Sequence, residues 1–154
     1  MSTTFVESQL ATSRTTGIAT QTLNTVSRFA GAEINNATNL DELYDLDITF
    51  TLAATPVAGD PINVHLIYAM DGTNYEDGAP TTNDGAHDDG NALPASSQVA
   101  AIGVQAISTA QKVTLRDIPV MPYKLKIVLR NGTTKSCTSL LTVLAYGKHY
   151  QNIG

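Results

Sequence analysis

Residues 44–52 read YDLDITFTL and alternate strictly between apolar and polar side chains. The even positions carry Tyr, Leu, Ile, Phe and Leu, whereas the odd positions carry Asp and Thr. Successive side chains of a β-strand point to opposite faces, so this period of two predicts a strand with one buried and one solvent-facing side. A strand of this kind is typical of an antiparallel sheet.

The pattern of residues 44–52 recurs further along the chain and sets the fold class. Apolar and polar residues alternate again in 62–70 and 123–130, a weaker alternation covers 97–107, and residues 138–146 form an apolar, β-branched run. Proline and glycine interrupt the pattern between these segments, and no stretch is convincingly helical beyond one turn within 39–46. The sequence therefore predicts an all-β fold, an antiparallel β-sandwich or jelly-roll-like single domain.

The length of 154 residues suits one domain with a core of its own. Residues 1–28 are rich in Thr and Ser and are expected to form an extended N-terminal arm or an edge strand, with the sandwich in 29–154. The start lacks the features of a signal peptide, and no apolar run is long enough to span a bilayer, so we expect a protein made in the cytoplasm without membrane contact. Cys137 is the only cysteine, so no disulfide within the chain supports the fold.

Charge is divided unevenly along the chain. The net charge is −5, which argues against nucleic acid as a partner, because phosphate binding needs an excess of Lys and Arg. Residues 1–111 hold two basic and thirteen acidic side chains, whereas residues 112–154 hold seven basic and one acidic side chain. Either the two parts interleave within one domain and neutralise each other, or they make head-to-tail contacts between copies.

A long acidic loop, residues 71–93, follows the second strand. It begins DGTNYEDG and carries six carboxylates up to Gly90 with no Lys or Arg. Asp71, Glu76 and Asp77 are weak candidates for a Ca²⁺ site, although the spacing does not match the helix-loop-helix calcium motif. A solvated or partner-facing loop is the preferred interpretation, and no cofactor is expected. Among its later residues, the acidic candidates for an interface are Asp84, Asp88 and Asp89.

The sequence offers no catalytic group. The three histidines form no H-x-H or H-x-x-x-H pair of zinc ligands, and one cysteine among scattered histidines does not predict a nucleophile. The acidic loop supplies no apolar wall that could raise the pKa of a general acid. No nucleophile-elbow or phosphate-binding motif is present. We therefore expect a protein that is not an enzyme.

Basic residues in the C-terminal part are the best candidates for an interface. On the strand interpretation, Lys124, Lys126 and Arg130 share one face. A second strand places two further cations on one face, and all five would form one basic patch if the strands are neighbours; these two are Lys112 and Arg116. Ordinary solvent-facing charge that guards a sheet edge is the simpler interpretation. The alternative is a docking face for an acidic surface, such as the 71–93 loop of another copy.

Three segments in a fixed order resemble small structural proteins of tailed-phage virions. They are YAMDGTNYEDG, the proline-broken LRDIPVMPYKLKIVLRNGT, and LTVLAYG. The resemblance covers roughly residues 44–147 and implies a β-sandwich or jelly-roll subunit of a capsid or tail, with decoration (cement) proteins as the first choice. It also implies that the Ser/Thr-rich start is an arm that lies across neighbouring subunits. It carries no catalytic residues.

The leading hypothesis is thus a non-enzymatic virion protein that decorates the capsid, binds the major capsid protein or other virion proteins, and forms homo-oligomers. Its expected location is the virion, assembled in the host cytoplasm. A tail or head–tail connector component is the close alternative. A calcium- or carbohydrate-binding β-sandwich module is the alternative from a different class of protein.

Overall fold

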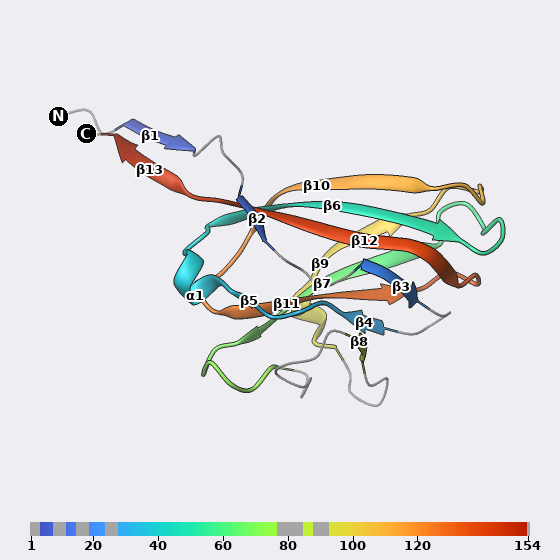
Figure 1. Cartoon of the computed structure of the whole chain (residues 1–154), viewed down its shortest axis with the longest axis horizontal. Helices are drawn as coiled ribbons and strands as arrows, with labels where there is room; N and C mark the ends of the chain where they lie inside the picture. Colours follow the sequence, from blue (N-terminus) through green and yellow to red (C-terminus); the bar gives the residue numbers. More distant parts are fainter. Residues whose placement is uncertain are drawn as a thin grey trace.

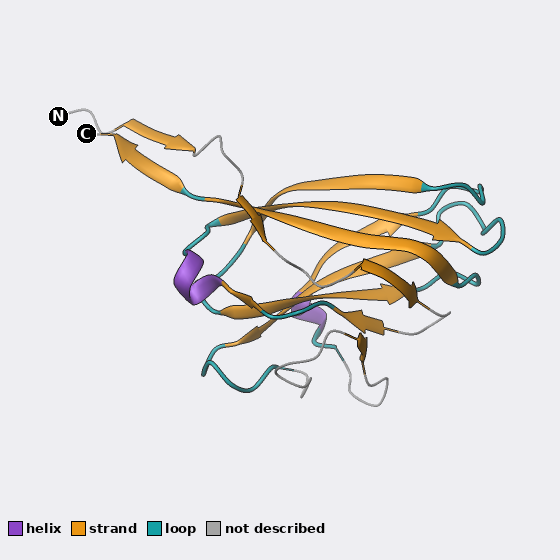
Figure 2. Cartoon of the chain, viewed as in Figure 1, coloured by secondary structure: helices purple, strands orange, loops and turns teal. Residues whose placement is uncertain are grey.

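The computed structural model describes residues 4–7, 12–14, 19–23, 28–76, 85–87 and 93–153. Within these residues two antiparallel sheets pack face to face, as Figure 1 and Figure 2 show. The prediction of an antiparallel β-sandwich is therefore confirmed. None of the helices in the described ranges has the length and apolar character that crossing a bilayer requires.

Sheet I has five strands and contains the segment that decides the fold. The strand β6 (Leu43–Leu52) lies at its centre, between β10 (Gln111–Pro119) and β12 (Cys137–Lys148). Two short N-terminal strands pair with the other edge of β12; they are β2 (Thr12–Arg14) and β3 (Ala19–Leu23). Every second residue of β6 is buried, as its alternating sequence predicts.

Sheet II has six strands. The order of its main path is β8 (Gly85–His87), β4 (Arg28–Ala30), β11 (Lys124–Asn131), β7 (Pro61–Ala69) and β9 (Gln98–Gly103). The two-residue strand β5 (Ile34–Asn35) also pairs with β11 and leads into a single helical turn, α1 (Asn36–Asn39). A 3₁₀ turn, η1 (Ala95–Ser97), precedes β9. All described strand pairs are antiparallel.

The chain crosses repeatedly from one sheet to the other. The connections β6 to β7, β9 to β10, β10 to β11 and β11 to β12 all change sheet. Each crossing brings alternate apolar side chains of both sheets into one core, which contains Tyr44, Ile48, Phe50, Leu125 and Ile127 among others. Strands distant in sequence therefore share the core, and the core depends on most of the chain.

The outer face of sheet II is covered as well. A second apolar cluster lies on that face and contains Ala30, Ile67, Ala69, Tyr75 and Val128, with Leu93 packed against it. Tyr75 and Leu93 come from the two ends of the 71–93 loop. This cover explains why β7 and β11 bury consecutive residues on both faces, whereas β6 alternates.

The two ends of the chain meet in a ribbon of their own. The strand β1 (Thr4–Glu7) pairs with β13 (Tyr150–Ile153), and Figure 1 shows this ribbon standing away from the sandwich at one end of the molecule. We call it the terminal ribbon. The described parts of residues 1–28 thus include strands that pair with β12, β11 and β13, and the separate arm stays a prediction.

Candidate functional site

The acidic turn after β7 folds around the Asp71 carboxylate. The backbone N–H groups of Thr73 and Asn74 donate to Asp71 Oδ1 at 2.8 and 2.7 Å, and Asn74 Nδ2 donates to Oδ2 at 2.8 Å. Hydrogen bonds from Asn74, followed by the one from Thr73, lower the pKa of Asp71 to about 2. Both carboxylate oxygens are therefore engaged in shaping the turn, an arrangement common where Asp begins a loop.

Of the other acidic candidates of the loop, the structure describes Glu76. Glu76 is exposed, and its backbone N–H donates to the carbonyl of Tyr68 at 3.2 Å. Asp77, Asp84, Asp88 and Asp89 lie outside the described residues. Among the residues that the structure describes, no group of three or more His, Cys, Asp or Glu side chains could hold a metal ion.

Beneath the loop, a polar network includes two of the basic candidates. The hydroxyl of Tyr75 donates to Glu33 Oε2 at 2.9 Å, and Lys124 Nζ pairs with Glu33 Oε1 at 3.1 Å. Lys126 Nζ lies 5.1 Å from the centre of the Tyr75 ring, within cation–π distance. Burial, reinforced by the hydrogen bond to Glu33 and its negative charge, raises the pKa of Tyr75. The network thus fixes the start of the loop, at Tyr75, to the outer face of sheet II.

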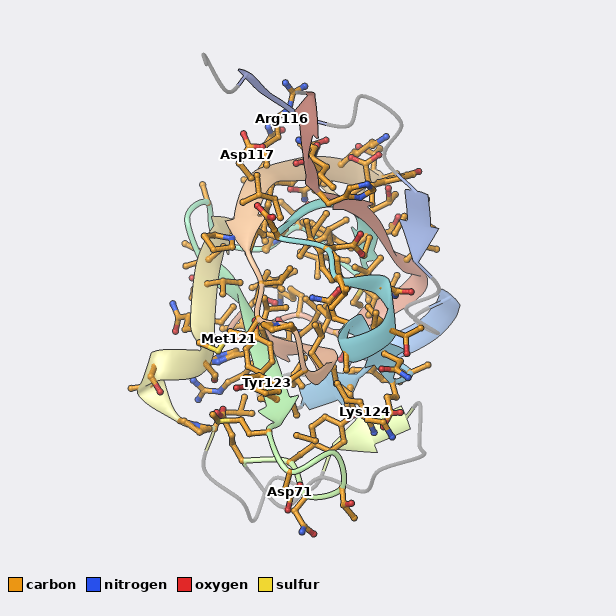
Figure 3. All side chains as sticks on the ribbon, turned by 90° about the vertical axis from the view of Figure 1, so that its left-hand side faces the viewer. Asp71, Arg116, Asp117, Met121, Tyr123 and Lys124 are labelled. Carbon is orange, nitrogen blue, oxygen red and sulfur yellow. The ribbon has the colours of Figure 1, made fainter. Side chains whose placement is uncertain are left out.

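The five basic candidates do not gather into a single patch, for two reasons. First, Lys126 does not share a solvent-facing side with Lys124 and Arg130, because its side chain is completely buried under the cover of sheet II. Second, Lys112 and Arg116 belong to β10 in sheet I, whereas the other three belong to β11 in sheet II. Figure 3 shows Arg116 and Lys124 far apart on the same end of the molecule.

The outer face of sheet I carries a ladder of paired charges. Lys148 Nζ lies 2.8 Å from Asp45 Oδ2 and 2.9 Å from Asp117 Oδ1. Lys112 Nζ lies 3.0 Å from Asp47 Oδ2, and the hydroxyl of Thr114 donates to Asp47 Oδ1 at 2.6 Å. Each of the two lysines pairs with a carboxylate on a neighbouring strand, so these charges stabilise the sheet rather than forming a field of one sign.

The two carboxylates of this ladder are held in the ionised form. Burial alone would raise the pKa of Asp45, but hydrogen bonds from Lys148 and from the Asp117 backbone, with the charges of Lys148 and Arg116, lower it. Hydrogen bonds from Thr114 and then Lys112 lower the pKa of Asp47. The backbone of Asp117 adopts φ 54° at a bulge in β10, where its N–H donates to Asp45 Oδ1 at 2.9 Å. The sequence analysis did not single out Asp45, Asp47 or Lys148, although their outward positions follow from the alternation in β6 and β12.

A buried serine and histidine lie side by side on sheet II. His65 Nδ1 is 3.0 Å from Ser97 Oγ, and the Ser97 hydroxyl donates to the carbonyl of Pro94 at 2.7 Å. The one hydroxyl proton is used in that bond, so the histidine N–H donates to the serine oxygen. A catalytic serine requires the opposite direction, with its proton passing to the histidine. This pair anchors η1 on the sheet instead.

One depression lies at the end of the sandwich that Figure 3 presents, between β9, η1 and the segment after β10. Its volume is about 240 Å³. The lining residues are Leu66, Tyr68, Glu76, Ser96, Ser97, Val99, Pro119 and Met121. Pockets for small molecules are usually larger, from about 300 Å³ upward, so this space suits a side chain of a partner better than a substrate. Val99 and Met121 are exposed apolar residues at its rim.

Comparisons with known proteins leave the family open. No protein-family model matches the chain, and no curated protein matches it in sequence.

Proposed function

We propose that this chain is a non-enzymatic structural protein of a tailed-phage virion, and specifically a decoration subunit that binds the major capsid protein. The order of the three sequence segments described above supports this class. In the part of the chain that the structure describes, the charges of the ladder on sheet I pair with one another and the depression is small, which suits a subunit that acts by binding.

The terminal ribbon is the observation that carries the proposal. Among the described strands, β1 pairs only with β13, and Figure 1 shows that the ribbon projects beyond the body of the sandwich. An isolated two-stranded ribbon is marginally stable in water and gains by pairing or packing with a further element. A neighbouring capsid subunit can supply that element, as the proposed arm requires.

Decoration needs no chemistry beyond binding. A subunit that binds the assembled capsid and not its dissociated parts stabilises the capsid by mass action. A rigid sandwich supplies the bulk of such a subunit, and a projecting ribbon lets it reach across the joint between two capsid subunits. The tail or connector alternative uses the same features on another surface of the virion.

The proposal is tested by removing the ribbon. A variant that lacks residues 1–7 and 150–154 keeps all strands of sheets I and II. We expect its melting temperature to stay within a few degrees of the parent, while its co-sedimentation with purified phage heads that lack the decoration protein is lost. Val57→Ser, at an exposed loop residue, is the control and should bind like the parent.

Other outcomes would separate the alternatives. Undiminished binding of the truncated variant to heads would remove the ribbon from the mechanism. Binding of the parent to isolated tails but not to heads would overturn the decoration role and favour the tail component. A melting temperature that rises in calcium and falls in EDTA would favour the calcium-binding module instead.

A further inference from the structure

The depression at the end of the sandwich combines apolar walls with a carboxylate. Its apolar lining runs from the buried Leu66 to the exposed Val99, Pro119 and Met121. Among the lining residues that the structure describes, only Glu76 carries a charge. A side chain that enters the depression therefore meets apolar surface along its length and one negative charge.

The charge of Glu76 acts within the depression, on the hydroxyl of Tyr68. Burial raises the pKa of Tyr68, a hydrogen bond from the Met121 backbone lowers it, and the negative charge of Glu76 raises it further. Such an effect requires the carboxylate to lie near the hydroxyl, because the interaction of two charges weakens with distance and with exposure to water. The backbone of Glu76 is held beside the same residue, since its N–H donates to the Tyr68 carbonyl at 3.2 Å.

Within the described ranges, no Lys, Arg or His forms an ion pair with Glu76. Lys124, at the same end of the molecule, is paired with Glu33 at 3.1 Å instead. Residues 29–111 supply most of the lining and contain twelve Asp and Glu but no Lys or Arg. The depression is therefore complementary in charge to a cation that comes from outside the chain.

We propose that the depression binds a lysine side chain presented by a protein partner. The methylene groups of the lysine lie against Leu66, Val99 and Met121, and its ammonium group donates to the Glu76 carboxylate. The hydroxyl oxygen of Tyr68 is a second acceptor nearby. Lysine commonly buries its aliphatic stem in this way while the charged head stays at the boundary with water.

Lysine fits this space better than other side chains do. An acidic side chain is repelled by Glu76, and an apolar one removes water from the carboxylate without replacing its hydrogen bonds. The guanidinium group of arginine is wide and planar, and it carries five donors that need acceptors. The ammonium group of lysine is compact and carries three, which suits a depression of about 240 Å³ with one carboxylate.

The depression and the terminal ribbon lie at the same end of the molecule. Figure 1 shows the ribbon projecting from this end, and Figure 3, which views the same end, shows Met121 at the depression. One partner can therefore contact both, and two weak contacts to one partner reinforce each other. The inference rests on the proposed function for the identity of this partner, a virion protein, and adds the chemistry of the group that the partner inserts.

The site is tested on purified protein without capsids, so its failure and the failure of capsid binding are seen separately. The probe is Nα-acetyl-lysine N-methylamide, and the backbone amide signals of Glu76, Val99 and Met121 are followed by NMR. We expect saturable shifts at these residues with a dissociation constant in the millimolar range, because one side chain makes a small contact. The norleucine analogue has the same stem without the ammonium group and should bind at least about fivefold more weakly. Equal binding of the two analogues, or no shifts at these residues, would overturn the proposal.

The role of the carboxylate is tested by two matched variants. Glu76→Gln removes the charge and keeps the size of the side chain, so we expect it to bind the lysine analogue at least about fivefold more weakly, with a melting curve like that of the parent. Glu42→Gln removes the same charge from an exposed residue outside the lining and should bind like the parent. Undiminished binding by Glu76→Gln, or equal losses in both variants, would refute the site, because the attraction would then come from the overall negative charge.

Discussion

Lys126 is charged, yet its side chain has no exposed surface. Its position in β11 alternates with apolar residues, and the alternation alone places it on a solvent-facing side. The structure instead covers that side with Tyr75, whose ring lies 5.1 Å from Lys126 Nζ. A covered lysine is not visible in the local sequence, because the residue that covers it belongs to a distant loop.

Tyr75 joins the start of the loop to sheet II, and we predict that its hydroxyl contributes to the stability of the fold. Tyr75→Phe removes the hydrogen bond to Glu33 and keeps the ring, and Glu33 retains Lys124 as a partner. We expect a loss of about 1 kcal/mol in the free energy of unfolding near neutral pH, measured by urea denaturation.

The same substitution should change the response to alkaline pH. The pKa of Tyr75 is raised in the folded state, so its contribution to stability is complete below the ordinary tyrosine pKa of about 10 and is lost as the pH rises beyond it. The stability of Tyr75→Phe should therefore fall less steeply above pH 10 than that of the parent. Glu33→Gln keeps an acceptor without the charge and should give an intermediate slope. Identical slopes in parent and Tyr75→Phe would contradict the assignment.

At the scale of single elements, β6 and β11 show what alternation can predict. The sequence predicts a strand over 44–52, and the structure has it over Leu43–Leu52, because one face of β6 is buried and the other is open to solvent. The same rule fails for β11, where both faces are covered. It also cannot reveal which strands are neighbours, so only the structure decides whether the basic residues of β10 and β11 can form one patch, and it places them in different sheets.

A close contact between β12 and the segment just before β6 is the basis of the next prediction. A Cβ at Gly147 would overlap the carboxylate of Asp41. Asp41 is buried, and Asn36 holds its backbone in place. The N–H of Asp41 donates to Asn36 Oδ1 at 3.0 Å, and its carbonyl accepts a hydrogen bond from Asn36 Nδ2 at 2.9 Å. We expect Gly147→Ala to cost about 1–3 kcal/mol of unfolding free energy.

Urea denaturation of a matched pair of variants measures this cost. Gly103→Ala is the control, because a Cβ there would meet only the backbone of Gly59 at an ordinary contact distance of 3.7 Å. Its unfolding midpoint should lie close to that of the parent. Equal midpoints for the two variants would show that Asp41 can move aside and that the contact at Gly147 is not restrictive.

At the scale of the whole molecule, the chain crosses repeatedly between the sheets, so strands that are distant in the sequence contribute to one core. Cys137 begins β12 and belongs to the core cluster between the sheets, and its side chain is completely buried. Burial raises the pKa of its thiol and so disfavours the reactive thiolate, although a backbone hydrogen bond from Thr51 acts in the opposite direction. A reagent can reach the sulfur only after the surrounding strands have separated.

The reactivity of this thiol therefore measures how the domain opens. We expect Cys137 to react with a thiol reagent at least about a thousandfold more slowly in the folded protein than in urea, because folded domains are stable by about 5–15 kcal/mol. If the sandwich opens as one unit, the labelling rate at low urea should rise with the same slope as equilibrium unfolding. Thr114→Cys provides an exposed thiol for comparison and should add one rapidly labelled site. A labelling rate of Cys137 that does not depend on urea would contradict cooperative opening, because it would mean that the start of β12 separates from β6 while the rest of the core stays folded.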